Sequence, residues 1–329
     1  MSRWLLPTLL LCLLGCRPAV AAGEVIDPAA PPYRQLLSEL VAEHGFARDE
    51  LAELFAGVEI NQRILELMDG QWEAQPYHRY AARLLSWWNV GNGRRLLKRH
   101  AGLLAEIEAE FGVEREIIVA IWGVESNYGH NEGDFRAFEV LNTIFAAYPR
   151  RAAFYRRQLI DFLLLCREND LDPRTVRSSP GGALGQAQFI PSSFRAYAVD
   201  YDDSGRRDLW HSIPDVLASI ANYLRHFGWR PGRPRYAELG DELHDPRLKR
   251  ASRDGRDGVL PKAEIEAAQG VKLPPVADDR PLRIVGLQQP DGTTRYLAAY
   301  PNFQAITYWN NSYRYAMAVI ELAEKFAAR

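Results

Sequence analysis

Apolar residues recur at intervals of three and four along most of the chain, a spacing typical of amphipathic helices. The first such face begins with Leu36, Leu37 and Leu40, and similar faces continue to about residue 99. Gly112 interrupts the pattern between two later segments. Beyond residue 99 the spacing predicts helices over 106–111, 113–124, 151–166, 215–227 and 316–326.

The pattern changes between residues 230 and 300, where proline and glycine accumulate and helical spacing fades. Apolar segments at 282–287 and 296–300 flank a Pro-Asp-Gly turn, which predicts a β-hairpin. The expected fold class is therefore mainly α, of the α+β type. We divide it into a linker at 22–32, an N-terminal helical domain at 33–100, a core at 101–229 and 296–329, and a small β-containing insertion at 230–295.

The first 21 residues have the pattern of a signal peptide, with Arg3 before about ten apolar residues, too few to span a membrane. Cleavage after Ala19-Val20-Ala21 would release a soluble exported protein. Leu13-Leu14-Gly15-Cys16 resembles a lipoprotein box, which would leave an outer-membrane lipoprotein acylated at Cys16. Leu14 stands where a smaller residue is commoner, so the soluble form is slightly favoured. Since no later run reaches eighteen apolar residues, no transmembrane span is expected in the mature chain.

Composition narrows the function classes. The 329 residues suffice for two or three domains, and 47% hydrophobic with 25% charged residues is typical of a globular protein. A net charge of −2 gives no electrostatic argument for nucleic-acid binding. Cys166 is the only cysteine after residue 16, which excludes a disulfide framework and a cysteine-ligated zinc site.

One glutamate stands at the end of an unusually apolar helix. Residues 117–124 are apolar on every face, so this helix is predicted to be buried all round. Glu125 follows it, between Trp122 and Tyr128, and desolvation there would raise the pKa of its carboxyl. A raised pKa suits a general acid working near neutral pH. The alternative is that a helix-end glutamate turns to solvent.

A glycine-rich stretch at 178–194 is the second candidate element. Small residues let the backbone approach a ligand closely, and Gln188 adds an amide that both donates and accepts hydrogen bonds. The stretch has no phosphate-binding lysine, which argues against a nucleotide loop. The alternative is an ordinary loop before a helix capped by Ser192 or Ser193.

Four segments together resemble the membrane-bound lytic murein transglycosylase B family (lytic transglycosylase family 3). They are Gly-Val-Glu-Ser-Asn-Tyr-Gly at 123–129, Ala-Leu-Gly-Gln-Ala-Gln-Phe-Ile-Pro-Ser-Ser at 183–193, Ala-Asn-Tyr at 221–223 and Asn-Phe-Gln-Ala-Ile-Thr-Tyr-Trp-Asn at 302–310. The resemblance implies a lysozyme-like catalytic core in a periplasmic enzyme. It also implies that the partners are peptidoglycan glycan strands, with cell-wall synthesis proteins as further candidates.

The resemblance also assigns roles to individual residues. Glu125 matches the single catalytic acid/base. The residues matched to the glycan cleft are Ser179, Gln188, Phe189, Tyr223, Arg150, Arg151, Trp309, Asn310 and Tyr315. Trp309 stands where the family usually has tyrosine, so it keeps a stacking surface but lacks a hydroxyl. Trp87 and Trp88 are interpreted as packing residues, with an extension of the sugar-stacking surface as the alternative.

Most glycosidases use two carboxylates, but no second one here has a comparable motif. Glu132 and Asp134 lie in a polar stretch and are interpreted as solvated. The resemblance implies a substrate-assisted reaction that cuts the MurNAc–GlcNAc bond and leaves 1,6-anhydroMurNAc ends. The alternatives are a lysozyme-type hydrolase of the same fold and a catalytically silent peptidoglycan-binding scaffold.

An acidic loop begins like an EF-hand, with oxygen donors at positions 1, 3, 5 and 9 and glycine at position 6, although His211 occupies position 12. The resemblance implies a structural calcium ion with a closing carboxylate farther along the chain. Its ligands would be Asp200, Asp202, Ser204, the Arg206 carbonyl and Asp215. The alternative is an acidic surface turn tied by Arg–Asp pairs. No organic cofactor is expected.

Overall fold

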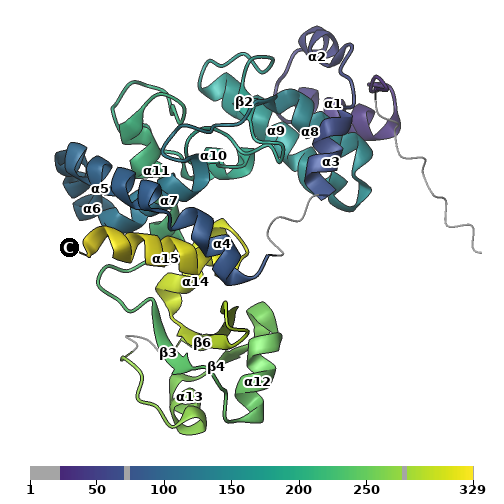
Figure 1. The fold of residues 1–329 in the computed structure, drawn as a ribbon. Coiled ribbons are helices and arrows are strands. Elements are labelled where there is room, and N and C mark those ends of the chain that lie inside the picture. The colour runs from purple at the N-terminus through teal and green to yellow at the C-terminus, as the bar shows by residue number, and fades with distance from the viewer. Residues whose placement is uncertain (1–22, 70–74, 276–279, 329) are drawn as a thin grey trace, which may run out of the picture.

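The computed structural model describes residues 23–69, 75–275 and 280–328, so the signal sequence and Cys16 lie outside the described residues. Most of the described chain is helical (Figure 1). The helices are α1 (Pro31–Ala42), α2 (Arg48–Phe55), α3 (Gln62–Asp69), α4 (Tyr77–Leu84), α5 (Trp87–Arg99), α6 (Ala101–Phe111), α7 (Arg115–Ser126), α8 (Ala137–Ala147), α9 (Ala152–Glu168), α10 (Pro191–Tyr197), α11 (Ile213–His226), α12 (Pro246–Arg253), α13 (Lys262–Gln269), α14 (Pro301–Trp309) and α15 (Tyr313–Ala327). Across the described ranges, no helix has the length and apolar character needed to cross a bilayer.

Helix α7 is the centre of the main core. Residues 117–123 are all buried, which confirms the prediction of a helix enclosed on every face. Helices α5, α6, α11 and α15 pack around it. The break expected at Gly112 is also confirmed, because this glycine ends α6 in the left-handed conformation at φ 67°.

Residues 33–100 do not form a core of their own. Helices α1 and α3 pack on α9 and α8, whereas α4 and α5 pack on α15 and α7 (Figure 1). The buried residues of both groups belong to the same continuous cluster as α7. The segment interpreted as one N-terminal helical domain therefore supplies two separate layers to the main body, and the second of these layers lies next to α7.

The small β-containing part has a separate core. Its antiparallel sheet has the order β3 (Tyr236–Gly240), β6 (Thr294–Ala299), β5 (Leu282–Gln288), β4 (Val259–Leu260). The β5–β6 hairpin is confirmed, with Gly292 in its turn at φ 85°. Although helical spacing fades in this segment, it contains two short helices, α12 and α13, and α12 packs on β5. Both span only eight residues, too few to show a sustained helical period. The boundary placed at residue 296 falls inside β6.

Candidate active site

Glu125 lies in the last turn of α7 and is half-buried. The hydroxyl of Tyr315, on α15, donates a hydrogen bond of 2.5 Å to its Oε1 atom. Tyr315 is 2% exposed. Burial, together with the neighbouring Glu125 carboxylate, raises the pKa of Tyr315 well above its usual value of 10. The hydroxyl therefore keeps its proton near neutral pH and can donate to the carboxylate.

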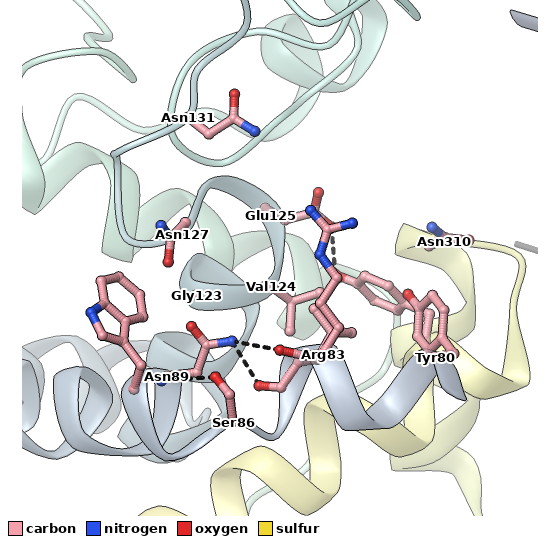
Figure 2. Close-up of a pocket in the computed structure, with 13 residues that line it drawn as sticks. Tyr80, Arg83, Ser86, Asn89, Gly123, Val124, Glu125, Asn127, Asn131 and Asn310 are labelled. Carbon is pink, nitrogen blue, oxygen red and sulfur yellow. Dashed lines mark hydrogen bonds between the residues drawn. The ribbon is translucent and has the colours of Figure 1, made fainter. Parts of the chain in front are cut away.

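Glu125 faces a cavity of about 610 Å³ between α4, α5, α7 and the start of α15. Figure 2 shows the amides of Asn127, Asn131 and Asn310 around the carboxylate, with Tyr80 and Arg83 of α4 along one side. Of the residues that line this cavity in the described chain, Glu125 is the only acidic one. The cavity can therefore hold a polar ligand of sugar size against one carboxylate.

Sequence reasoning missed much of this lining. Tyr80, Arg83 and Ser86 come from the α4–α5 region, far from any of the motifs, and nothing in the local sequence marks them as cavity residues. Asn127 lies inside the glutamate motif, and Asn131 follows its last residue by two positions. The occurrence of two asparagines so soon after Glu125 in the sequence was the signal that could have identified them as cavity residues.

Several predicted cleft residues form the wall behind the cavity. Trp309 packs on Phe189 and Tyr223, with ring centroids 4.9 and 4.6 Å apart. Phe189 is 2% exposed and Tyr223 is 6% exposed. The Tyr223 hydroxyl donates to the carbonyl oxygen of Tyr308 at 2.7 Å. Of the nine predicted cleft residues, Asn310 and Tyr315 line the Glu125 cavity directly.

The glycine-rich loop is fixed against α7 by a buried amide. Gln186 accepts a hydrogen bond from the Trp122 indole at 3.0 Å and donates to the carbonyl of Trp210 at 2.6 Å. Gln188 has a left-handed backbone at φ 49°, and its amide donates to the Gly185 carbonyl at 2.9 Å. The Ser179 hydroxyl accepts from the backbone N–H of Ala183 at 3.1 Å.

The alternative of an ordinary loop with a serine cap is wrong in one respect. Helix α10 begins after Ile190 without a side-chain cap, and neither Ser192 nor Ser193 occupies the capping position. The loop is held by the Gln186 contacts and by its own turns.

The two predicted arginines lie beside this loop. Both are exposed, and the Arg151 guanidinium stands over the rings of Phe154 and Tyr155 at 5.2 and 5.5 Å. The Tyr155 hydroxyl donates to the Gly181 carbonyl at 3.0 Å, which ties α9 to the loop. Arg150 stacks over Tyr148 at 5.4 Å. The pair thus offers positive charge at the side of the glycine-rich loop.

The five predicted metal ligands converge. Carboxylate oxygens of Asp200, Asp202 and Asp215 lie within 4.8 Å of one another. The Ser204 hydroxyl lies 3.3 Å from Asp200 Oδ1 and 3.1 Å from the Arg206 carbonyl oxygen. An all-oxygen donor set of this kind suits Ca²⁺.

One member of this group, Asp215, is buried, and its surroundings test whether the five residues fit a cation. Asp215 is fully buried and accepts backbone N–H groups from Tyr201 and Asp208, both at 2.8 Å. Burial raises its pKa, and the nearby Asp202 acts in the same direction. A cation among these oxygens would offset both effects. The Arg206 guanidinium pairs with Asp170 at 3.9 Å and the Arg207 guanidinium with Glu168 at 2.6 Å, so both arginines of the loop are held by acidic residues outside it.

The interpretation of Glu132 as solvated was wrong. Glu132 is half-buried, and burial raises the pKa of its carboxyl. It lines a second cavity together with Arg177 and His211, separate from the lining of the Glu125 cavity. Asp134 is exposed, as expected. Neither residue therefore supplies a second carboxylate to the Glu125 cavity.

A mainly helical, lysozyme-like fold with a carboxylate in a sugar-sized cavity is an arrangement typical of glycan-cleaving enzymes. The chain matches the transglycosylase SLT domain family over residues 29–324, and it belongs to that family. It is a lytic transglycosylase. It is 31% identical over 307 residues to the membrane-bound lytic murein transglycosylase B of Escherichia coli K12, covering 90% of this chain and 83% of that protein.

Two solved structures are similar over most of the chain. The lytic transglycosylase Slt35 of Escherichia coli, in complex with calcium, is 30% identical with a TM-score of 0.78, covering 93% of this chain and 96% of that one. SltB3 of Pseudomonas aeruginosa, in complex with NAG-anhNAM-pentapeptide, is 32% identical with a TM-score of 0.75, covering 90% and 79%.

Proposed function

We propose that this enzyme cleaves the β-1,4 bond between MurNAc and GlcNAc in peptidoglycan strands and leaves 1,6-anhydroMurNAc ends, with Glu125 as the sole general acid/base. The observation that carries the proposal is that Glu125 is the one carboxylate among the described residues lining the cavity, which suits a substrate-assisted reaction and not one that uses a carboxylate pair. The relative SltB3, whose structure holds an anhydro-muramyl ligand, supports the same product.

The reaction has two proton transfers through one residue. Protonated Glu125 gives its proton to the glycosidic oxygen, the C1–O bond breaks, and GlcNAc leaves with a free 4-hydroxyl. The N-acetyl oxygen of MurNAc stabilises the positive charge at C1. Glu125, now a carboxylate, takes the proton of the MurNAc 6-hydroxyl while O6 forms its bond to C1. Glu125 ends protonated, so the cycle closes without water.

Tyr315 positions the carboxylate for both transfers. Its hydrogen bond to Oε1 fixes the orientation of the carboxylate beside the cavity. The bond strengthens as Glu125 becomes charged, so it stabilises the step in which the proton leaves. The 6-hydroxyl belongs to the bound sugar and has a large effective concentration, which lets ring closure compete with hydrolysis.

The other predicted cleft residues take supporting roles in this proposal. Asn310, which lines the cavity, is suited to hydrogen-bond an N-acetyl or hydroxyl group. Trp309, which is half-buried and is backed by Phe189 and Tyr223, can offer a sugar ring an apolar surface, and Ser179 and Gln188 belong to the loop that carries Phe189. Arg150 and Arg151 would meet the acidic or peptide portions of the strand.

Glu125→Gln tests the proposal. We expect it to lose activity on purified murein by several orders of magnitude while still binding glycan strands, because the amide keeps the shape but cannot transfer a proton. Glu132→Gln is the matched control and should stay active. Mass spectrometry of the parent's products should show anhydro ends. Ends heavier by one water would establish a hydrolase, and a fully active Glu125→Gln variant would refute the assignment of the acid.

We also propose a structural calcium ion at the acidic loop, held by Asp200, Asp202, Ser204, the Arg206 carbonyl and Asp215. When bound, the ion would fix the loop between α10 and α11. Calorimetry on chelator-treated protein should show calcium binding, and Asp215→Asn should abolish it. Asp170→Asn, which removes a nearby exposed carboxylate, should leave it unchanged. No heat at millimolar calcium would leave an acidic turn without a metal.

The segment before residue 22 is proposed to export the chain to the periplasm. Mass analysis of the mature protein distinguishes a free N-terminus after Ala21 from an acylated Cys16. A Cys16→Ala variant that still fractionates with membranes would exclude the lipid anchor.

A further inference from the structure

Two neighbouring tryptophans, Trp87 and Trp88, begin α5. Their exposure is too large for packing to explain the presence of both. Trp87 is 85% exposed and Trp88 is 38% exposed. The interpretation of the pair as packing residues is therefore wrong for Trp87. Two adjacent large rings at a surface mark a binding site more often than isolated apolar residues do.

Trp88 belongs to the cavity that holds Glu125. It lines this cavity, and its ring centroid lies 6.4 Å from Tyr128 and 6.3 Å from His130. Tyr128 and His130 belong to the turn that follows the catalytic helix. Trp88 is therefore part of the same lining as Glu125, and Trp87 directly precedes it at the start of α5.

The backbone that carries the two rings is held in place. The Ser86 hydroxyl caps α5 by accepting from the Asn89 N–H at 3.3 Å, and the Asn89 amide donates to the Leu84 carbonyl at 2.8 Å (Figure 2). The Tyr128 hydroxyl donates to the Asn89 carbonyl at 2.7 Å, which joins the start of α5 to the turn after Glu125. Because this backbone is already fixed, little of it has to be ordered when a ligand binds. Less of the binding free energy gained from the contacts is then lost to conformational entropy.

We propose that Trp88, with Trp87 beside it, forms an additional subsite that stacks a saccharide ring of the glycan strand beyond the two sugars at the cleaved bond. The inference rests on the proposed function. A pyranose ring has an apolar C–H face and a polar rim; the indoles match the face, and the amides of Asn127 and Asn131 at the same cavity match the rim.

A lipid surface is the other candidate for exposed tryptophans, since such rings are enriched at membrane interfaces. Continuity with the Glu125 cavity favours the glycan. A tryptophan that only contacts a membrane has no reason to line the cavity that holds Glu125, whereas Trp88 does line it.

Strand-length dependence tests the subsite. In a Glu125→Gln background, which stops turnover, binding is measured to peptide-free glycan strands of one to several disaccharides. Trp88→Ala should weaken binding of the longer strands roughly two- to tenfold and leave the single disaccharide unchanged. Trp87→Ala should act in the same direction on the longest strands. Trp88→Phe should retain most of the affinity, and Lys98→Ala on the exposed part of α5 should retain all of it.

Three results would overturn the proposal. Unchanged affinity in either alanine variant excludes that ring from the subsite. An equal loss at every strand length assigns Trp88 to the bond-cleaving centre or to folding, and thermal unfolding of each variant separates these. Binding to phosphatidylglycerol-containing vesicles that Trp87→Ala abolishes, with glycan binding intact, assigns the pair to a membrane. If the parent binds no strand of any length, the proposed function itself fails, and this outcome is distinct from the other three.

Discussion

Replacing Tyr315 by phenylalanine removes one hydroxyl next to the proposed acid and little else. Phenylalanine keeps the ring that packs at 2% exposure, so the core around α15 stays filled. What is lost is the 2.5 Å hydrogen bond to Glu125 Oε1. The perturbation therefore isolates the contribution of one donor to the carboxylate.

The magnitude follows from the kind of bond. Hydrogen bonds to charged groups contribute about 1.5–3 kcal/mol, which corresponds to roughly a 10- to 150-fold loss of kcat if the bond is made mainly to the charged carboxylate. The sign of the pH effect follows as well. Glu125 must carry a proton to start the reaction, and losing the donor makes its ionisation harder. The basic limb of the activity profile should therefore move to higher pH.

The assay is the release of soluble fragments from purified murein over a range of pH. Tyr313→Phe is a matched control on the same helix, because the Tyr313 hydroxyl is buried without a hydrogen-bond partner among the described residues. It should keep full activity and equal or greater stability. If Tyr315→Phe stays within twofold of the parent and its profile does not move, Tyr315 does not position the acid.

Three further predictions concern the supporting structure. Gly133→Ala should destabilise the protein well beyond the roughly 1 kcal/mol expected for Gly292→Ala in calorimetry. Both glycines have positive φ, 94° and 85°, but only at Gly133 would the new Cβ lie 2.1 Å from the Ser178 carbonyl carbon. Trp309→Ala should cost about 2 kcal/mol in urea unfolding, less than a fully buried tryptophan, whereas Trp309→Tyr should recover most of it by keeping a ring against Phe189. Burial alone would raise the pKa of Glu168, but hydrogen bonds from Arg195 and Arg207 hold it below its usual 4.5. The stability this gives is present above about pH 4.5 and is lost as the pH falls through the folded-state pKa, so melting temperatures of Glu168→Gln should fall less steeply in acid than those of the parent.

The elements that the sequence predicted well are those decided by local chemistry. The apolar run at 117–124 requires burial on every face, and the structure encloses α7 accordingly. Gly112 ends a helix because its left-handed conformation is easy only for glycine. The Pro-Asp-Gly turn specifies the β5–β6 hairpin for the same kind of reason.

The cavity lining escaped prediction because distant packing decides it. Tyr80 and Arg83 reach Glu125's cavity only because α4 packs on α15, and no local pattern encodes that contact. The resemblance assigned Phe189 and Tyr223 to the cleft, yet it could not show that both are buried and packed against Trp309. Family motifs indicate which residues gather at a site, and packing decides which of them face it.

The glutamate motif can nevertheless be explained residue by residue, beginning with its turn. Asn127 and Tyr128 are consecutive left-handed residues, at φ 53° and 59°, and such backbone costs about 1–2 kcal/mol per residue. The cost is offset by the buried Tyr128 ring and its hydroxyl bond to Asn89. Gly123 makes room for that ring, since a Cβ there would lie 2.5 Å from it.

The rest of the motif secures the turn to its neighbours. The Ser126 hydroxyl donates to the Trp122 carbonyl at 3.2 Å and accepts the Gly129 N–H at 3.0 Å. A Cβ at Gly129 would lie 2.4 Å from the Gln186 oxygen that binds the Trp122 indole, so glycine there is required by the contact that holds the loop. Each of these residues has a packing role. Glu125 accepts the hydrogen bond of the buried Tyr315 hydroxyl, but a half-buried carboxylate also costs desolvation, and the proposed acid/base role accounts for a charged group at this position.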